Sequence, residues 1–507
     1  MTIYNFNLLV GYESTGVDYA QGYRARILRD LCRQKYIFTE LPNYRELEYY
    51  TRIGIAEEEI IALPLWLAGV NRVFPTKSYE EVRQAVIPDV QGYVYSESGA
   101  RRTYTRAGSG EAVIFCLTDA GKVHSVEYYM KNTLLRRDHW SDRLIYSEYM
   151  TVENDKDSLF VRVRLVSYYD ESGKTALKEY RTENERFYVF PDHTRLSTLE
   201  LLERFLTKTA FGRDDLILMD RVGSHFQMIL KHKGAARTAF FMHSKLTFED
   251  YSDSHHWRGI NYEYVDLVRC AGQIDAFLVS TEEQAKELRE WFLREYGISV
   301  GTYVLPVGGI SGLLHPVEPR KQHSLVTVSR LDHRKRIDLL IKACVIARRS
   351  VPDLSLDIYG KGPRFFDYLK LIEECGARGF VRLMGYVDNF DRYASYEGYI
   401  SASLWETFGL TLLEAVSRGL PLIGLDVPYG NRTFIQNDRN GYLIPYENGE
   451  DENVTVEHLA EAIKKLFTGD DLARFSDCSY REAGAYTMEA IAERWRAFLK
   501  ELGEIEK

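Results

Sequence analysis

The 507-residue sequence has few of the features that mark secreted, membrane-spanning or disordered proteins. Its six cysteines are scattered, with no CxxC pair and no metal-like cluster, so we expect neither a disulfide framework nor a cysteine metal site. It has only 13 prolines and 45% apolar residues, which gives no reason to expect extended disorder. The most apolar run, residues 60–70, is broken by Pro64 and Gly69 and falls short of the roughly 20 residues that cross a membrane. The amino terminus lacks the pattern of a signal peptide, so we expect a cytoplasmic protein without a transmembrane segment.

The charge balance is unfavourable for broad binding to polyanions. Lys and Arg number 65 against 74 Asp and Glu, giving a formal charge of −9. This surplus disfavours general binding of nucleic acid or anionic lipid, although local basic sites remain open. The length predicts two or three domains, at roughly 100 to 200 residues each.

Two stretches of the chain alternate between strand-like and helix-like segments. Residues 3–10 are typical of a buried strand, residues 11–16 (GYESTG) of a loop, and residues 17–31 of a helix. The same alternation returns after about residue 197, and a second series begins at residues 324–329 (SLVTVS). We therefore predict an α/β protein of the GT-B type, with two Rossmann-like doubly wound domains facing a cleft.

The stretch from about residue 75 to residue 195 has a different pattern. Short segments rich in Val, Tyr and Phe are separated by turn-like residues 119–122 and 170–173, which predicts an antiparallel β-meander. The last twenty residues are typical of an amphipathic helix. We predict four parts: an N-terminal Rossmann-like domain of residues 1–50 and 197–305, an inserted β-meander domain of residues 51–196, a C-terminal Rossmann-like domain of residues 306–484, and a helix within residues 485–507 that packs back on the N-terminal domain.

Residues 403–415 (SLWETFGLTLLEA) carry the sharpest chemical signal. A strand ends near Ser403, a loop holds Glu406, and a helix opens around Gly409, so free amides and the positive helix end face the crevice above the sheet. Glu414 lies roughly one and a half to two turns into this helix, so the two carboxylates could hold separate parts of one extended ligand. The alternative is an ordinary loop glutamate and a helix glutamate, and the pattern alone does not decide between them.

Residues 328–338 (VSRLDHRKRID) lie at a second transition from strand to helix. Arg330 and Lys335 stand on the loop and first turn, where cations oppose the helix dipole unless an anion such as a diphosphate lies between them. A solvated charged turn is the alternative, weakened by the position at the carboxyl end of a strand. Gly360 belongs to a nearby glycine loop that could let a base or ribose approach the backbone.

The N-terminal domain offers weaker signals. Residues 11–16 match neither GxGxxG nor a Walker motif, so nicotinamide binding and ATP hydrolysis lose support. His243, at the end of the strand-like segment TAFFMHS, could line the cleft. A lone histidine at a strand end is more often hydrogen-bonded structure.

Together these motifs resemble retaining glycosyltransferases of the GT-B fold, in the glycogen-synthase-like group called family 4. The resemblance rests on E-x7-E (Glu406, Glu414), R-x4-K (Arg330, Lys335) and the adjoining GYVDN and GLPLIGLDVPYGN segments. Over the whole chain, the amino-terminal segment, the meander insertion and DVPYGNRTFIQNDRNGYLIPY are similar to the catalytic-subunit family of accessory-Sec O-linked N-acetylglucosaminyltransferases. Wall teichoic acid glycosyltransferases share the layout and are the nearest competitor.

The resemblance implies a role for each motif residue. Glu414 would hold the uridine ribose, and Arg330 and Lys335 would bind the diphosphate without a metal or other cofactor. The sugar hydroxyls would be held by Glu406 and by the backbone amides of Phe408, Gly409 and Leu410. Gly16 would let the first loop approach the β-phosphate, and His243 would border the reacting sugar carbon.

The implied activity is transfer of N-acetylglucosamine from UDP-GlcNAc to Ser or Thr hydroxyls of a serine-rich repeat adhesin. A companion non-catalytic subunit would assist, with partner or acceptor docking on the meander, and peripheral association with the inner membrane face is an option. One alternative is a teichoic acid glycosyltransferase using UDP-GlcNAc or UDP-glucose, since residues 131–164 are rich in Arg and Lys. Another is a non-catalytic, protein-binding subunit, which loss of Glu406, Arg330 or Lys335 would have indicated.

Overall fold

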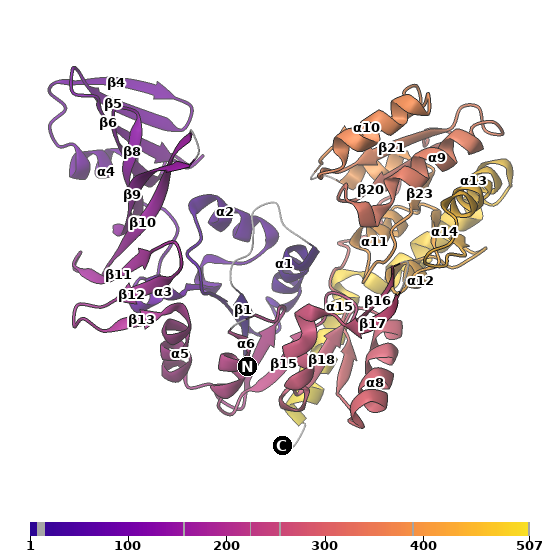
Figure 1. The fold of residues 1–507 in the computed structure, drawn as a ribbon, viewed down its shortest axis with the longest axis horizontal. Coiled ribbons are helices and arrows are strands. Elements are labelled where there is room, and N and C mark those ends of the chain that lie inside the picture. Colours follow the sequence, from indigo (N-terminus) through magenta and orange to yellow (C-terminus); the bar gives the residue numbers. More distant parts are fainter. Residues whose placement is uncertain (8–15, 156–157, 224, 253–254, 388–389, 505–507) are drawn as a thin grey trace. The chain divides into compact units, whose positions relative to one another are not determined.

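The structure is a computed structural model that describes residues 1–7, 16–155, 158–223, 225–252, 255–387 and 390–504. The chain forms two compact units, and each is described by itself. One comprises Met1–Asp18 and Cys32–Ala239, and the other comprises Tyr19–Leu31 and Phe240–Lys507. Figure 1 labels the elements along the chain. In the described part, no helix is both long enough and apolar enough to span a bilayer.

Seven short strands form a Rossmann-like sheet in the order β19-β18-β15-β14-β1-β2-β3. The pairs β1–β14, β1–β2, β2–β3 and β18–β19 are parallel. Buried, apolar strands such as β18 fit a sheet covered on both faces. The strands are β1 (Thr2–Asn7), β2 (Arg33–Phe38), β3 (Ile60–Ala62), β14 (Asp215–Met219), β15 (Arg237–Phe241), β18 (Ala276–Val279) and β19 (Thr302–Val304). A separate hairpin pairs β16 (Thr247–Ser252) with β17 (His255–Ile260).

Local capping explains where several helices of this part begin. Asn43 and Ser197 form capping boxes with Glu46 and Glu200, and Thr281 caps the next long helix. The helices are α1 (Gly16–Leu28), α2 (Tyr44–Ile53), α3 (Leu63–Leu67), α5 (Thr198–Thr209), α6 (Phe226–Lys231), α7 (Val265–Arg269) and α8 (Glu282–Tyr296). The predicted helix at residues 17–31 thus ends at Leu28, and residues 8–10 of the predicted first strand lie outside the described residues.

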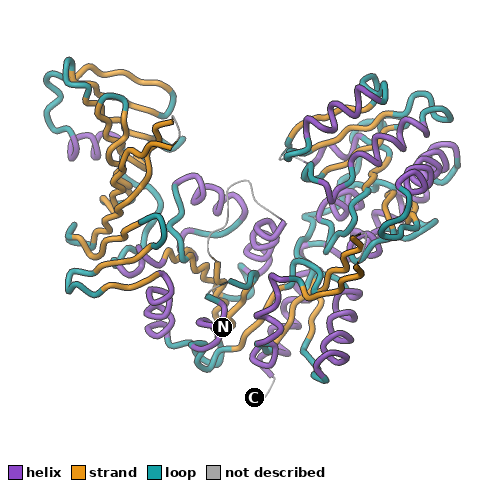
Figure 2. The backbone as a smooth tube through the Cα atoms, viewed as in Figure 1, coloured by secondary structure: helices purple, strands orange, loops and turns teal. Residues whose placement is uncertain are grey.

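The predicted meander is a ten-stranded antiparallel sheet in which strands β4 to β13 follow one another in chain order. Figure 2 shows these strands in orange. Val82 of α4 (Tyr79–Val86) packs with Phe115 and Val126 in its core. The predicted turns are present, with Gly121 and Gly173 at φ 73° and 78°. The strands are β4 (Tyr93–Ser98), β5 (Arg101–Arg106), β6 (Glu111–Leu117), β7 (Val123–Met130), β8 (Thr133–Trp140), β9 (Leu144–Asp155), β10 (Ser158–Tyr169), β11 (Thr175–Arg181), β12 (Arg186–Val189) and β13 (Arg195–Ser197).

Six strands form the second Rossmann-like sheet, in the order β22-β21-β20-β23-β24-β25. All its pairings are parallel. The strands are β20 (Ser324–Val328), β21 (Ser355–Tyr359), β22 (Val381–Gly385), β23 (Gly398–Ser401), β24 (Leu422–Leu425) and β25 (Gly441–Ile444). The helices are α9 (Ile337–Ala347), α10 (Phe365–Glu374), α11 (Leu410–Ser417), α12 (Gly430–Phe434), α13 (Glu452–Thr468), α14 (Leu472–Ala483) and α15 (Met488–Glu504).

Hydrophobic periodicity placed the core face of α9 correctly. Ile337, Leu340, Ile341, Cys344 and Ala347 are all buried in one cluster, as predicted. The two parallel sheets and the antiparallel sheet confirm the predicted fold class.

The last helix contacts the end of the seven-stranded sheet. Phe498 of α15 packs edge-on against Tyr303 of β19 with ring centroids 4.9 Å apart, and Tyr303 Oη donates to Glu501 at 3.0 Å. The boundary predicted at residue 51 precedes β3, a strand of that sheet. The domain boundaries themselves stay predictions.

Candidate functional site

The motif residues of the C-terminal sheet lie at its topological switch point. β20 pairs with β21 on one side and with β23 on the other, and the strand order runs in opposite directions from there. Figure 1 shows β21, β20 and β23 side by side. The loop after β20 carries Arg330 and Lys335, and the loop after β23 carries Glu406. Ligands of open α/β sheets bind in the crevice at this position.

Asp332 organises the loop after β20. Its Oδ1 accepts the backbone N–H of Arg334 at 3.0 Å and thereby caps a short 3-10 helix, His333–Lys335. Its Oδ2 accepts Nε of Arg330 at 2.9 Å and a guanidinium N–H of Arg334 at 3.0 Å. Burial alone would raise the pKa of Asp332, but the hydrogen bonds and charges of Arg334 and Arg330 lower it. The Arg330 side chain is still 53% exposed, so its remaining donors are free to meet an anion.

Lys335 and Glu406 meet across the two loops. Nζ of Lys335 donates to Oε1 of Glu406, and the two side chains are only 20% and 17% exposed. The structure thus brings together two residues that the sequence placed on separate segments 71 positions apart. Because this ammonium and this carboxylate lie half-sheltered from water, each acts in a lower dielectric than on an open surface.

The backbone around Glu406 is held by a segment that sequence reasoning did not single out. The carbonyl oxygen of Glu406 accepts the N–H groups of Tyr429 at 2.9 Å and Gly430 at 2.6 Å. Gly430 is required here, because a Cβ would lie 2.2 Å from the carbonyl oxygen of Phe408. Tyr429 Oη in turn donates to Glu287 of α8 at 2.7 Å. The only sequence signal for this support was the adjoining GLPLIGLDVPYGN segment, which named no contact.

The loop after β23 ends in a strained turn that starts α11. Gly409 has φ 84° and is the N-cap, and a Cβ there would lie 2.7 Å from Leu412. Phe408 is buried, with its ring centroid 5.2 Å from that of Phe434. The first amides of a helix have no partners within the helix, so the N–H groups of Gly409, Leu410 and their neighbours suit hydroxyl or anionic ligands.

Glu414, in the second turn of α11, has an unpaired oxygen in a dry position. Oε2 is buried and finds no hydrogen-bond partner among the residues that the structure describes. Burial raises the pKa of Glu414 to about 8, although the charge of Arg418 lowers it. Tyr23 of α1 lies close by, since burial and then the Glu414 charge raise the pKa of Tyr23 to about 12. A buried oxygen without a partner costs about 1–3 kcal/mol, which a ligand hydroxyl would offset.

Gly360 has a packing role that is sufficient to explain the glycine. Its φ is 146°, and a Cβ would lie 1.8 Å from the carbonyl oxygen of Ser329. Gly362 likewise approaches Leu331, where a Cβ would lie 2.4 Å from the carbonyl oxygen. These two glycines therefore press their loop against the loop that carries Arg330.

Two further residues singled out in the N-terminal domain have less defined surroundings. His243 lies two residues beyond β15, and its ring stacks on Phe241 with centroids 5.0 Å apart. Gly16 is the first residue of α1 and belongs to the other compact unit, and residues 11–15 of its loop lie outside the described residues. Within the described ranges, no group of three or more His, Cys, Asp or Glu side chains is arranged to hold a metal ion.

Comparison with known proteins gives a consistent result over the whole chain. Residues 315–479 match the family described as glycosyl transferases group 1, and residues 95–192 match the GtfA extended beta-sheet domain. The UDP-N-acetylglucosamine–peptide N-acetylglucosaminyltransferase GtfA subunit of Streptococcus agalactiae is 35% identical, covering 99% of both chains. The poly(ribitol-phosphate) alpha-N-acetylglucosaminyltransferase of Staphylococcus aureus is 23% identical, covering 94% of this chain and 90% of its own.

Two solved structures are similar over the full length. The pneumococcal O-GlcNAc transferase GtfA in complex with UDP and GlcNAc has a TM-score of 0.88 and 29% identity, covering 100% of this chain and 99% of its own. A structure of the GtfA/B complex has a TM-score of 0.87 and 33% identity, covering 100% of both chains.

Proposed function

Because the chain belongs to the family of GtfA subunits of UDP-N-acetylglucosamine–peptide N-acetylglucosaminyltransferases, we propose that it is the catalytic subunit of such an enzyme. It transfers N-acetylglucosamine from UDP-GlcNAc to Ser or Thr hydroxyls of a serine-rich protein. The observation that carries the proposal is the switch-point site, where Lys335 meets Glu406 and Glu414 holds an unpaired buried oxygen. A UDP-sugar donor places the reaction in the cytoplasm.

In this proposal the two loops divide the donor between them. Arg330 and Lys335 bind the diphosphate and stabilise the negative charge that grows on the leaving UDP. Glu406 and the amides of Phe408, Gly409 and Leu410 hold the sugar hydroxyls. His243 borders the reacting carbon, and Gly16 and Gly360 keep their loops close to the nucleotide.

Glu414 holds the ribose as a neutral acid at pH 7. With a pKa of about 8 in the ligand-free protein, its carboxyl group carries a proton over most of the physiological range. A protonated carboxyl both donates and accepts, so it can pair with two vicinal ribose hydroxyls. Its unpaired Oε2 then gains the partner that the protein does not supply.

The transfer itself retains the configuration of the sugar. The acceptor hydroxyl forms a bond to the anomeric carbon on the face from which the diphosphate leaves, and the bond from that carbon to the diphosphate breaks. The proton of the hydroxyl passes to a phosphate oxygen. The two fixed cations supply the electrostatic stabilisation that a metal supplies in other transferases, so catalysis should persist in EDTA.

The teichoic acid alternative is less well supported because the basic residues of the meander are already paired. All five arginines within residues 131–164 have carboxylate partners. The closest pairs are Arg136 with Asp138 at 2.6 Å and Arg137 with Glu127 at 3.0 Å. A polyol-phosphate acceptor would need uncompensated cations. The sheet therefore favours a neutral acceptor.

A companion subunit fits the exposed face of the same sheet. Val152 of β9 and Val161 of β10 are directly paired across the strands, and their side chains are 49% and 43% exposed. Exposed apolar side chains in a contiguous position mark protein interaction sites. We assign this face to the companion subunit, and a non-catalytic role for the chain is disfavoured because Arg330, Lys335, Glu406 and Glu414 are all present.

The test is UDP release from UDP-GlcNAc by the chain with its companion subunit and a serine-rich peptide. Parallel reactions use UDP-glucose, a poly(ribitol-phosphate) acceptor and added EDTA. We expect release with UDP-GlcNAc and peptide, unchanged by EDTA. Faster release with the polymer would support the teichoic acid alternative, and no release with any acceptor would support a non-catalytic subunit.

A further inference from the structure

In the ten-stranded sheet, β10 and β11 part before either reaches the end of the sheet. Their pairing begins at Leu165, opposite Tyr180, and runs toward Tyr169. On its other side β10 pairs with β9 along its length, with a shift in register between Val163 and Leu165. Among the described residues, the segment 160–163 of β10 therefore has a strand neighbour on one side only. Such an edge offers free backbone N–H and C=O groups to an added strand.

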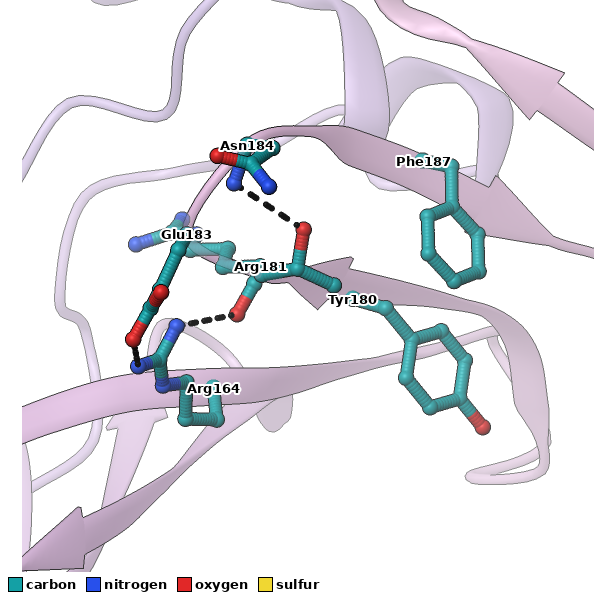
Figure 3. A pocket seen from close by; sticks show the side chains of 7 residues that line it. Arg164, Tyr180, Arg181, Glu183, Asn184 and Phe187 are labelled. Atoms are coloured by element: carbon teal, nitrogen blue, oxygen red, sulfur yellow. Dashed lines mark hydrogen bonds and ion pairs between the residues drawn. The ribbon is translucent and has the colours of Figure 1, made fainter.

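Arg164 lies at the register shift and holds the two strands apart. Its guanidinium donates to the carbonyl oxygen of Arg181 at 3.3 Å, the last residue of β11. Its Nε donates to Glu153 at 2.6 Å, and Glu183 lies 3.8 Å away. Figure 3 shows the side chain turned toward Arg181 and Glu183. The positive charge of Arg164 is thus compensated within the sheet.

A cavity of about 540 Å³ opens beside this residue. One wall is the stacked pair Tyr180 and Phe187, with ring centroids 5.2 Å apart and an interplanar angle of 11°. The opposite wall is the β11–β12 turn, residues 182–184, which exposes the amide of Asn184 (Figure 3). The turn is fixed, because Thr182 N–H donates to the carbonyl oxygen of Glu185 at 2.9 Å.

The chemistry of the lining favours a neutral polar ligand. Arg181 is paired with Glu179 at 2.6 Å, just as Arg164 is paired with Glu153 and Glu183. No excess charge of either sign is left to attract an ion. The aromatic wall and the exposed amide match a ligand with short apolar parts, hydroxyls and peptide groups.

We propose that this notch, formed by residues 160–163 of β10 and the adjoining cavity, binds an extended hydroxyl-rich segment of the polypeptide acceptor as an added strand. The proposal rests on the proposed function, because it takes the acceptor to be a polypeptide. Four residues of edge accommodate about 14 Å of extended chain, and the next side chains enter the cavity beside Asn184. A stable interface with a companion subunit would be more apolar than this lining.

The first test fills the cavity. Asn184→Trp should raise the KM for a serine-rich peptide about tenfold, a loss of about 1.4 kcal/mol of binding. UDP-GlcNAc hydrolysis without acceptor and affinity for the companion subunit should stay within twofold. Glu171→Trp, at the exposed β10–β11 turn, is the matched control and should leave the peptide KM unchanged. An unchanged KM in Asn184→Trp, or an equal fall in companion affinity, would overturn the proposal.

A second measurement does not depend on the folding of a bulky variant. A photo-reactive benzophenone amino acid at position 184, in the complex with its companion, should cross-link to a labelled serine-rich peptide, and excess unlabelled peptide should suppress the product. A cross-link to the companion alone would overturn the proposal. Failure of the wild-type complex to hydrolyse UDP-GlcNAc would instead contradict the proposed function, so the two failures are distinguishable.

Discussion

The ten-stranded sheet and the loops after β20 and β23 use buried charge in opposite ways. In the sheet, Asp138 lies 2.6 Å from Arg136, and Glu127 lies between Arg101 and Arg137 at 2.6 and 3.0 Å. In the loops, the Oε2 atom of Glu414 has no partner among the described residues.

The difference separates structural charge from functional charge. Burying a charged or polar group is costly unless its hydrogen bonds are made, so the sheet compensates its own charges within the fold. The loops leave a buried oxygen and a half-exposed guanidinium unsatisfied, which a ligand with hydroxyls and a diphosphate would complete. A basic residue count alone cannot tell the two apart, since both regions are rich in arginine.

Removing Lys335 should produce the largest effect. Lys335→Ala takes away one of two fixed cations at the leaving group, so kcat should fall by roughly 10²–10³. Lys342→Ala is the matched control, because that lysine lies on α9 and contacts only Glu452, at 3.8 Å. Steady-state UDP release measures both. Wild-type turnover in Lys335→Ala would contradict the assigned role.

Changing Glu414 should affect donor binding by a smaller factor. Glu414→Ala removes both ribose contacts, so the KM for UDP-GlcNAc should rise roughly 10- to 100-fold. Glu414→Gln should retain most of the affinity, because a neutral amide resembles the protonated acid expected at pH 7. Titration calorimetry with UDP gives the comparison, and equal losses in both variants would argue against a neutral acid.

Weakening the support of Glu406 from α8 should have a moderate effect. Glu287→Gln replaces the charged acceptor of Tyr429, whose backbone N–H holds the Glu406 carbonyl oxygen. We expect kcat/KM for UDP-GlcNAc to fall about tenfold, the range of one charge-assisted hydrogen bond. Glu290→Gln, on the exposed side of the same helix, should leave it unchanged. If both variants behave alike, Glu287 has no positioning role.

The pH dependence of stability should differ in sign between the two regions. Glu148 is buried, yet its contacts with His139 and Arg137 lower its pKa to about 2, so its stabilising contribution is present above about pH 4.5 and is lost as the pH falls toward 2. Glu414 keeps its proton in the folded state up to about pH 8, so the ligand-free protein loses stability as the pH rises from about 4.5 through 8.

Thermal unfolding across pH separates these contributions by a few degrees. Glu148→Gln should flatten the acid limb of the Tm curve, and Glu414→Gln should flatten the neutral-to-alkaline limb. UDP should reduce the alkaline loss in the wild type. The comparison fails if either variant changes the limb assigned to the other.

Much of the fold could be predicted from the sequence because its signals are local. Glycine turns and strand-like segments indicated the meander, and the spacing of apolar residues located the core face of α9. Four meander strands (β4, β5, β8 and β9) were not singled out, since their exposed, polar residues obscure the alternation. Long-range features were beyond local patterns: the Lys335–Glu406 contact, the Tyr429–Glu287 support and the pairing of the meander arginines each depend on tertiary structure.

The most direct test of the central claim is a crystal structure of the protein with intact UDP-GlcNAc. The account predicts diphosphate oxygens within about 3 Å of the Arg330 guanidinium and the Lys335 ammonium, with the ribose hydroxyls on Glu414. A nucleotide bound away from these three side chains would contradict it.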